Sequence, residues 1–221
     1  PVVGGFFDPS VAVSDATIFQ QIAEENQFNF KFAYVIDQDM LEARNYDRMA
    51  LLCYKPQADV HAKYDKPRAR YPGRELSDLA GVQYWLYRNA IATVGFRSWN
   101  SAAIYEELDR PLVLLYTKVD RKKNKKQYEY YANRLRKAAK QLKNKDSAIF
   151  AVAHVDHYSD ELERFKRTSD DAKEQKALLG IRDEGRFFAQ AGGVKFSGES
   201  VTSFVIAVLD GKISPVSIQE A

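Results

Sequence analysis

The sequence predicts an α/β fold built from two tandem domains, each with a mixed central sheet flanked by helices. One order of strand and helix patterns occurs twice, over roughly one hundred residues each time. The length of 221 residues also exceeds the usual domain of about 100–150 residues. Hydrophobic residues make up 45% of the chain, which supplies enough apolar side chains for two cores. We therefore expect domains at residues 1–91 and 92–221.

The first half begins with a compact apolar run, Val2–Phe7, which is closed by Asp8-Pro9-Ser10. This pattern is typical of a buried strand that ends in a turn. Ser14 is expected to cap the next helix, whose apolar residues recur at helical spacing until Asn26. The other expected elements are strands at 30–36, 49–54 and 60–64, a short helix at 39–46, a loop at 68–73 and a helix at 77–89.

The second half repeats this order. The expected strands lie at 111–116, 148–155, 177–182 and 186–190, with a short strand at 194–196. The expected helices lie at 127–142, 158–165 and 199–209. No helix or strand is predicted for the polar stretch 167–175. The turn Asp183-Glu184-Gly185 joins two strands, and Gly211 ends the last helix. Each half then closes a mixed four-stranded sheet between helices.

Charge is distributed unevenly along the chain. Residues 1–108 carry 11 basic and 14 acidic side chains, whereas residues 109–221 carry 22 basic and 16 acidic ones. Within 118–145 there are twelve Lys or Arg against Asp120 and Glu129 alone. This segment predicts a local positive potential that a partner could match.

In a redox fold with this order of strands and helices, the working dithiol would open the first long helix. This chain has a single cysteine, Cys53. The entrances of the two first helices, 8–12 and 119–122, hold no cysteine. No catalytic residue is therefore predicted. Cys53 lies in the middle of an apolar strand, which favours a small buried hydrophobe over a reactive thiolate.

A metal site and a cofactor site are both predicted to be absent. His154, Asp156, His157 and Asp160 lie within seven residues, but a strand end and a helix start point these side chains in different directions. Zinc needs four converging ligands. No phosphate-binding glycine loop, nucleophile elbow or His-Glu-x-x-His pattern is present.

Several stretches in the second half carry a family resemblance. They are ATVGFR (92–97), RPLVLLYTKVD (110–120), YANR (131–134), FAVA (150–153), ELERF (161–165) and GKISP (211–215). Their order and spacing resemble protein disulfide isomerases, in particular the tandem non-catalytic b and b′ domains of the calnexin-associated isomerase and its larger three-active-domain relative. The resemblance implies two redox-inactive thioredoxin-like domains, b at 1–91 and b′ at 92–221. It also implies a protein of the endoplasmic reticulum lumen that assists oxidative folding, with redox centres in flanking domains.

The basic run holds the residues expected to bind a partner: Lys122, Lys123, Lys125 and Lys126. The resemblance implies an acidic chaperone such as calnexin or calreticulin as one partner. One departure is that Val155 and Asp156 stand where the calnexin-associated relative has basic residues. The run also fits a solvated loop outside the helix, and nucleic acid is not predicted because the run lacks aromatic residues.

Unfolded or glycoprotein clients are the other partners that the resemblance implies. The isomerase family binds clients in an apolar pocket beside the short helix, here at 158–165. The patch expected from this chain combines Leu162, Phe165, Trp99 and Tyr105. Helical spacing alone favours Leu162 and Phe165 as core residues.

A free-standing thioredoxin-like adaptor or chaperone without enzymatic domains is the alternative to a region of a larger isomerase. Pro1 to Phe7 reads like the inside of a strand and lacks the pattern of a secretory signal, so we expect a piece of a longer protein. No apolar run approaches the length of a membrane span, and no membrane partner is predicted.

Overall fold

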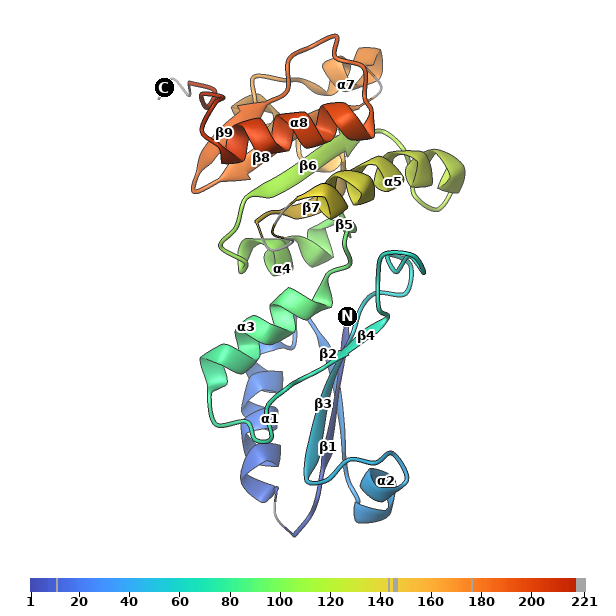
Figure 1. Ribbon diagram of the computed structural model, residues 1–221, viewed down its shortest axis with the longest axis vertical. Coiled ribbons are helices and arrows are strands. Elements are labelled where there is room, and N and C mark those ends of the chain that lie inside the picture. The colour runs from blue at the N-terminus through green and yellow to red at the C-terminus, as the bar shows by residue number, and fades with distance from the viewer. Residues whose placement is uncertain (11, 143, 145–146, 176, 218–221) are drawn as a thin grey trace. The chain divides into compact units, whose positions relative to one another are not determined.

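The computed structural model describes residues 1–10, 12–142, 144, 147–175 and 177–217 (Figure 1). The chain forms two compact units. Unit 1 comprises residues 1–92 and 106–108, and unit 2 comprises residues 93–105 and 109–221. Each unit has its own sheet, and the α/β class with two helix-flanked sheets is confirmed. None of the helices in the described part of the chain is both long and apolar enough to span a membrane.

Unit 1 contains a four-stranded sheet in the order β2-β1-β3-β4. Its strands are β1 (Val2–Phe7), β2 (Lys31–Ile36), β3 (Met49–Tyr54) and β4 (Arg68–Arg70), and its helices are α1 (Val13–Asn26), α2 (Gln38–Glu42) and α3 (Leu79–Ala90). Alternation along β1 places Phe7 against Phe19 of α1 and Phe6 against Tyr46, which follows α2. The sheet therefore lies between helices.

Unit 2 contains a five-stranded sheet in the order β5-β7-β6-β8-β9. Its strands are β5 (Gly95–Arg97), β6 (Leu112–Thr117), β7 (Ile149–His154), β8 (Leu178–Asp183) and β9 (Arg186–Ala189). Its α-helices are α4 (Ala102–Glu106), α5 (Lys125–Gln141), α6 (Ser159–Arg164), α7 (Ser169–Gln175) and α8 (Gly198–Leu209), with 3-10 turns η1 (Trp99–Ser101) and η2 (Val155–His157).

The core of unit 2 lies between the sheet and the paired helices α5 and α8. Val113, Val152 and Ile181 from the sheet meet Leu135 of α5 and Val205 of α8, and all five are fully buried. Alternation sends Tyr116 and Gly180 to the opposite face, where Phe165 after α6 packs. Helices therefore cover both faces, as a mixed sheet with parallel connections requires.

Two turn predictions are confirmed by backbone geometry. Glu184 and Gly185 both have positive φ, 48° and 75°, as a two-residue hairpin loop between β8 and β9 needs. Gly211 has φ 69°, and the N–H of Lys212 donates to the carbonyl of Ala207. This is the left-handed ending that glycine favours after a helix.

Four predicted local features are wrong. The segment 60–64 is a turn in which the Tyr64 N–H donates to the His61 carbonyl, and the fourth strand of unit 1 is instead β4, within the predicted loop. Residues 194–196 are irregular. Ser14 lies inside α1, whose N-cap residue is Ala12. Lys125 and Lys126 belong to α5, although the run was expected to lie outside the helix.

Four of the strands and α-helices in the described residues were not predicted: β4, β5, α4 and α7. Because β5 joins the sheet, unit 2 has five strands where four were predicted. Short elements of this kind lack a long periodic pattern, and β4 and β5 are three-residue edge strands held by the ladder to β3 and β7. Arg68 and Arg70 are exposed on β4, and charged side chains of this kind protect a sheet edge.

Candidate functional site

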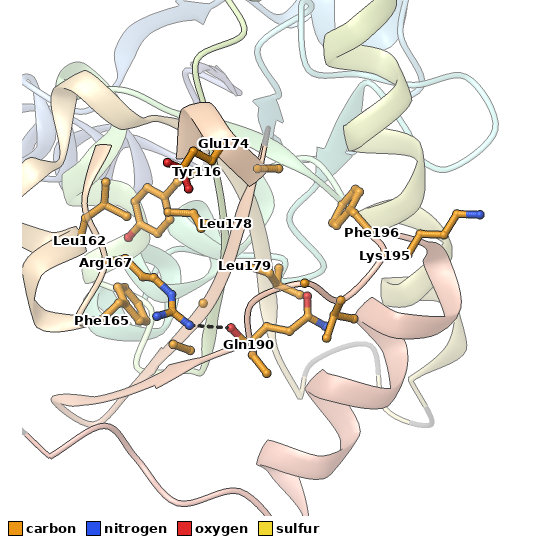
Figure 2. A pocket seen from close by; sticks show the side chains of 16 residues that line it. Tyr116, Leu162, Phe165, Arg167, Glu174, Leu178, Leu179, Gln190, Lys195 and Phe196 are labelled. Carbon is orange, nitrogen blue, oxygen red and sulfur yellow. Dashed lines mark hydrogen bonds between the residues drawn. The ribbon is translucent and has the colours of Figure 1, made fainter. Parts of the chain in front are cut away.

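A pocket of about 340 Å³ in unit 2 is lined by residues of β6, α6 and β8 and by the segment that follows β9, and we call it the α6 pocket. Figure 2 shows Tyr116, Leu162 and Phe165 on one side of it, and Lys195 and Phe196 on the other. The lining residues are Tyr116, Leu162, Phe165, Arg167, Glu174, Ala177, Leu178, Leu179, Gly180, Ala189, Gln190, Ala191, Gly193, Val194, Lys195 and Phe196.

Phe165 forms an aromatic wall of the α6 pocket. Its ring lies edge-on to Tyr116 and Phe187, with centroids 5.8 and 5.0 Å apart. The ring reaches the sheet because Gly180 has no side chain. A Cβ at that position would lie 2.5 Å from Phe165 Cε1. Nη2 of Arg167 donates to the Gln190 carbonyl oxygen over 3.2 Å, which holds a cation beside this pocket, whose lining also includes the polar residues Glu174 and Lys195.

A buried polar network supports the wall of the α6 pocket. Arg97 Nη1 lies 2.7 Å from Glu161 Oε2, and the Tyr116 hydroxyl donates to Glu161 Oε1 over 2.7 Å. Burial opposes the charge of Arg97, but the carboxylate of Glu161 outweighs it and raises the pKa of Arg97. Burial, followed by the negative charge of Glu161, raises the pKa of Tyr116 well above its ordinary value. Tyr116 is therefore kept as a neutral donor.

A second, more open pocket of about 550 Å³ lies beside the N-terminus of α5, and we call it the α5 pocket. Its lining residues are Lys126, Gln127, Tyr130, Tyr131, Ala177, Lys195 and Phe196. The rings of Tyr131 and Phe196 lie edge-on, 5.5 Å apart. Ala177, Lys195 and Phe196 line both pockets. The two pockets are therefore neighbours, and together we call them the groove.

A protein-family model described as a thioredoxin-like domain matches residues 11–173. This match covers more than half of the chain. The chain belongs to the thioredoxin-like domain family. A search among curated proteins finds no match.

Solved structures share this thioredoxin-like fold over nearly the whole chain. The bb fragment of ERp72 matches with a TM-score of 0.75 and 21% sequence identity, covering 97% of this chain and 90% of that chain. A structure of human ERp44 matches with a TM-score of 0.53 and 17% identity, covering 96% of this chain and 57% of that chain. A second form of human ERp44 also has a TM-score of 0.53, at 16% identity, and the chain covers 53% of it. At these identities the likeness shows the fold.

The predicted basic residues lie where the first long helix of the thioredoxin-like unit 2 begins. Lys122 and Lys123 occupy a turn and Lys125 and Lys126 open α5, and all four are exposed. Backbone N–H groups of Lys123 and Lys122 lower the pKa of Asp120. Lys126 alone of the four lines the groove. Lys143 and Lys145 lie outside the described residues.

The residues predicted as one client patch do not form one surface. Leu162 and Phe165 line the α6 pocket and are 1% and 2% exposed. Tyr105 is buried, with its hydroxyl close to the Cα of Gly95. Trp99 is 68% exposed and stacks on Tyr158 with centroids 5.8 Å apart. Only Leu162 and Phe165 therefore face a common cavity.

Sequence reasoning missed several residues of the groove, among them Arg167, Gln190, Lys195, Phe196 and Tyr130. Lys195 and Phe196 were predicted to lie in a short strand. In the structure they lie in a loop and line both pockets. The signal available was Gly192-Gly193, because two glycines just before a helix indicate a tight loop with neighbouring side chains exposed.

The histidine cluster does not make a metal centre. His154 Nδ1 lies 3.7 Å from Asp156 Oδ2, and the rings of His154 and His157 are 5.2 Å apart. Asp156 also pairs with Lys118 over 3.4 Å. Across the described positions, no group of three or more His, Cys, Asp or Glu residues could hold a metal ion.

Cys53 is expected to resist alkylation in the folded chain. It is fully buried in β3, and burial raises the pKa of its thiol from 9.0 to about 12. Iodoacetamide at pH 8 should modify it roughly 1,000-fold more slowly than in urea-unfolded chain, because the thiolate is the nucleophile. The folded state favours the thiol form of Cys53 over the thiolate. The stability that follows from this preference is present below pH 9 and is lost as the pH rises toward 12. Rapid labelling of the native chain, followed by mass spectrometry, would contradict this.

Proposed function

We propose that this chain is a non-catalytic binding region of a protein disulfide isomerase of the endoplasmic reticulum lumen, and that unit 2 holds extended segments of clients or chaperone partners. The observation that carries the proposal is the groove, in which two pockets join around Ala177, Lys195 and Phe196. The similarity of the fold to the bb fragment of ERp72 supports the isomerase assignment.

The groove has the chemistry of a peptide site. Phe165, Tyr131 and Phe196 offer apolar or aromatic surface, and a pocket of this size accepts one side chain or two. Lys126 and Lys195 line the more open part, and Arg167 lies at the other mouth. The occupant is an extended segment with an apolar side chain in the α6 pocket and acidic residues beside the lysines.

An acidic chaperone such as calnexin or calreticulin is the proposed natural source of such a segment. Lys122, Lys123 and Lys125 lie next to Lys126 along the chain and extend the positive potential beyond the groove. The end of β7 adds nothing to it, because Val155 is buried and Asp156 is paired with Lys118. Clients with mixed apolar and acidic segments are proposed to use the same groove.

The charge part of this proposal predicts weaker binding after charge reversal. The double variant Lys126→Glu, Lys195→Glu should bind a fluorescent peptide of alternating Glu and Leu at least about tenfold more weakly, as measured by anisotropy. Raising the salt concentration should reduce the difference in peptide affinity between the double variant and the unaltered chain, because salt screens exposed charges. Lys140→Glu is the matched control, since Lys140 is exposed in the last turn of the same helix.

The apolar part is tested by filling the α6 pocket. Ala191 is exposed and lines this pocket, whereas Ala103 is exposed on α4 and does not. Ala191→Leu should weaken binding of the same peptide and Ala103→Leu should not. The groove would be refuted as the site if the unaltered chain and all of these variants bound the peptide equally tightly. It would also be refuted if the unaltered chain bound a peptide with Lys in place of Glu as tightly as the Glu peptide.

A further inference from the structure

Strand β4 forms one end of the unit 1 sheet (Figure 1). Among the described residues it pairs only with β3, in the antiparallel direction. The carbonyl of Pro67 and the N–H of Tyr71, which flank β4, both bond toward β3. Backbone bonds alternate in direction along an antiparallel strand, so the N–H and carbonyl groups of Arg68 and Arg70 point away from the sheet. These two residues therefore offer an outward-facing backbone edge to a further strand.

The side chains of Arg68 and Arg70 are exposed, and they share one face of the sheet because they are two residues apart in a strand. Nη1 of Arg68 donates to the Tyr54 hydroxyl over 3.5 Å. Cζ of Arg70 lies 4.7 Å from the ring centroid of Tyr46. In the part of the chain that the structure describes, neither guanidinium has a carboxylate partner. Aromatic side chains therefore orient two cations that remain open to an external carboxylate.

A column of aromatic rings supports this face. The ring of Tyr46 lies 5.6 Å from that of Phe6, and Cζ of Arg44 lies 5.4 Å from the Phe6 centroid. Arg44 is exposed and adds a third positive charge to the column. Residues 1–108 carry 14 acidic side chains against 11 basic ones, so the positive charge of this face is a local feature that a partner could match.

The arginines select the kind of strand that can pair with β4. A second copy of β4, or any other basic strand, would bring like charges face to face, which disfavours pairing. An extended segment places alternate side chains on one face, about 6.6–6.8 Å apart. Carboxylates at alternate positions would therefore lie opposite Arg68 and Arg70. A guanidinium binds a carboxylate through two parallel hydrogen bonds, so the edge is matched to an acidic strand.

We propose that the edge of β4 binds an extended acidic segment of a partner protein as an added strand, with carboxylates at alternate positions paired to Arg68 and Arg70. The core of the segment is short, acidic-x-acidic, because Pro72, the next residue in the alternation, has no N–H to donate. This surface is independent of the groove and of the function proposed for it, since every residue that lines the groove belongs to unit 2.

Charge reversal on β4 is the first test. The probe is a fluorescent peptide of alternating Glu and Thr, which has no large apolar side chain for the α6 pocket. The double variant Arg68→Glu, Arg70→Glu should bind it at least about tenfold more weakly by anisotropy. The matched control is Lys63→Glu, Arg74→Glu, which reverses two exposed charges outside β4 and should stay within about threefold of the unaltered chain. Equal losses in the two double variants would overturn the proposal.

The spacing of the carboxylates is the second test. A peptide that repeats Glu-Glu-Thr-Thr has the same composition and charge, but no two of its glutamates are two residues apart. It should bind the unaltered chain at least about threefold more weakly than the alternating peptide, because only one carboxylate can then meet the two arginines. Equal affinity for the two peptides would show that charge alone attracts them, and would overturn the added strand.

Hydrogen exchange reports whether the peptide pairs with the backbone. A saturating concentration of the alternating peptide should slow exchange of the Arg68 and Arg70 amides at least about fivefold. Unchanged protection of the β1 and β3 amides reports that unit 1 stays folded in every variant. No slowing would overturn the proposal, and so would protection that rises with protein concentration alone, because a second copy would then cover the edge.

The groove variant Lys126→Glu, Lys195→Glu separates this site from the groove. It should bind the alternating Glu and Thr peptide within about threefold of the unaltered chain, because both lysines lie outside unit 1. A loss in this variant as large as in Arg68→Glu, Arg70→Glu would place the peptide in the groove and overturn the β4 site. Retained binding supports the β4 site whether or not the groove binds its own peptide.

Discussion

Replacing Glu161 with alanine is expected to lower the free energy of unfolding of unit 2 by about 3–5 kcal/mol, because a buried cation loses its partner. The side chains of Arg97 and Glu161 are only 5% and 12% exposed, and their charged atoms are 2.7 Å apart. The Tyr116 hydroxyl would also lose its acceptor. The measurement is hydrogen exchange of the slowest amides of β6 and β7, which reports unfolding of this unit.

Glu163→Ala is the matched control, since Glu163 is exposed on the same short helix and should change stability by less than about 0.5 kcal/mol. The double variant Arg97→Met, Glu161→Met should recover much of the loss, because apolar side chains of similar size leave no buried charge. A loss in Glu161→Ala no larger than in Glu163→Ala would show that the pair adds nothing to stability.

Replacing Phe165 with alanine is expected to cost about 3–5 kcal/mol, the usual loss for a buried aromatic side chain. Phe165 is 2% exposed and packs edge-on against Tyr116 and Phe187. The space left by the ring would merge with the α6 pocket of about 340 Å³. The neighbouring side chains therefore cannot readily move in to fill it, which keeps the cost of the cavity high. Hydrogen exchange of the same amides measures this loss.

Phe28→Ala controls for the change of residue type, because Phe28 is 91% exposed and its loss should cost less than about 0.5 kcal/mol. Gly180 gives a sharper test. A Cβ there would meet the Phe165 ring, so Gly180→Ala should be less costly in the Phe165→Ala background than alone. Strict additivity would argue against this contact.

The fold was predictable where a strand or helix buries a long apolar pattern. The bounds of β1 and β3 were predicted to the residue, because each is a compact apolar run between polar turns. Residues 60–64, which were predicted to be a strand, form a turn, whereas Arg68–Arg70 pair with β3. The charged edge strand β4 is held by its backbone hydrogen bonds to β3. Its own residues carry no pattern that predicts a strand.

The candidate site was predictable only in part. Leu162 and Phe165 were named from a resemblance, and Lys126 from a run of charge, and all three line the groove. Trp99 and Tyr105 do not line it, because Trp99 stacks outward on Tyr158 and Tyr105 packs against Gly95. Lys195, Phe196 and Arg167 enter the groove from loops, whose conformation leaves little trace in residue periodicity.

The sequence by itself determined the α/β class, the repeated order of elements, the single thiol and the uneven charge, because all of these follow from local composition and spacing. Tertiary structure alone decided that Gly180 makes room for Phe165, that Glu161 joins Arg97 to Tyr116, and that Arg70 of β4 lies over the ring of Tyr46. These features depend on residues that lie far apart in the chain, and only the folded arrangement of strands and helices brings those residues together.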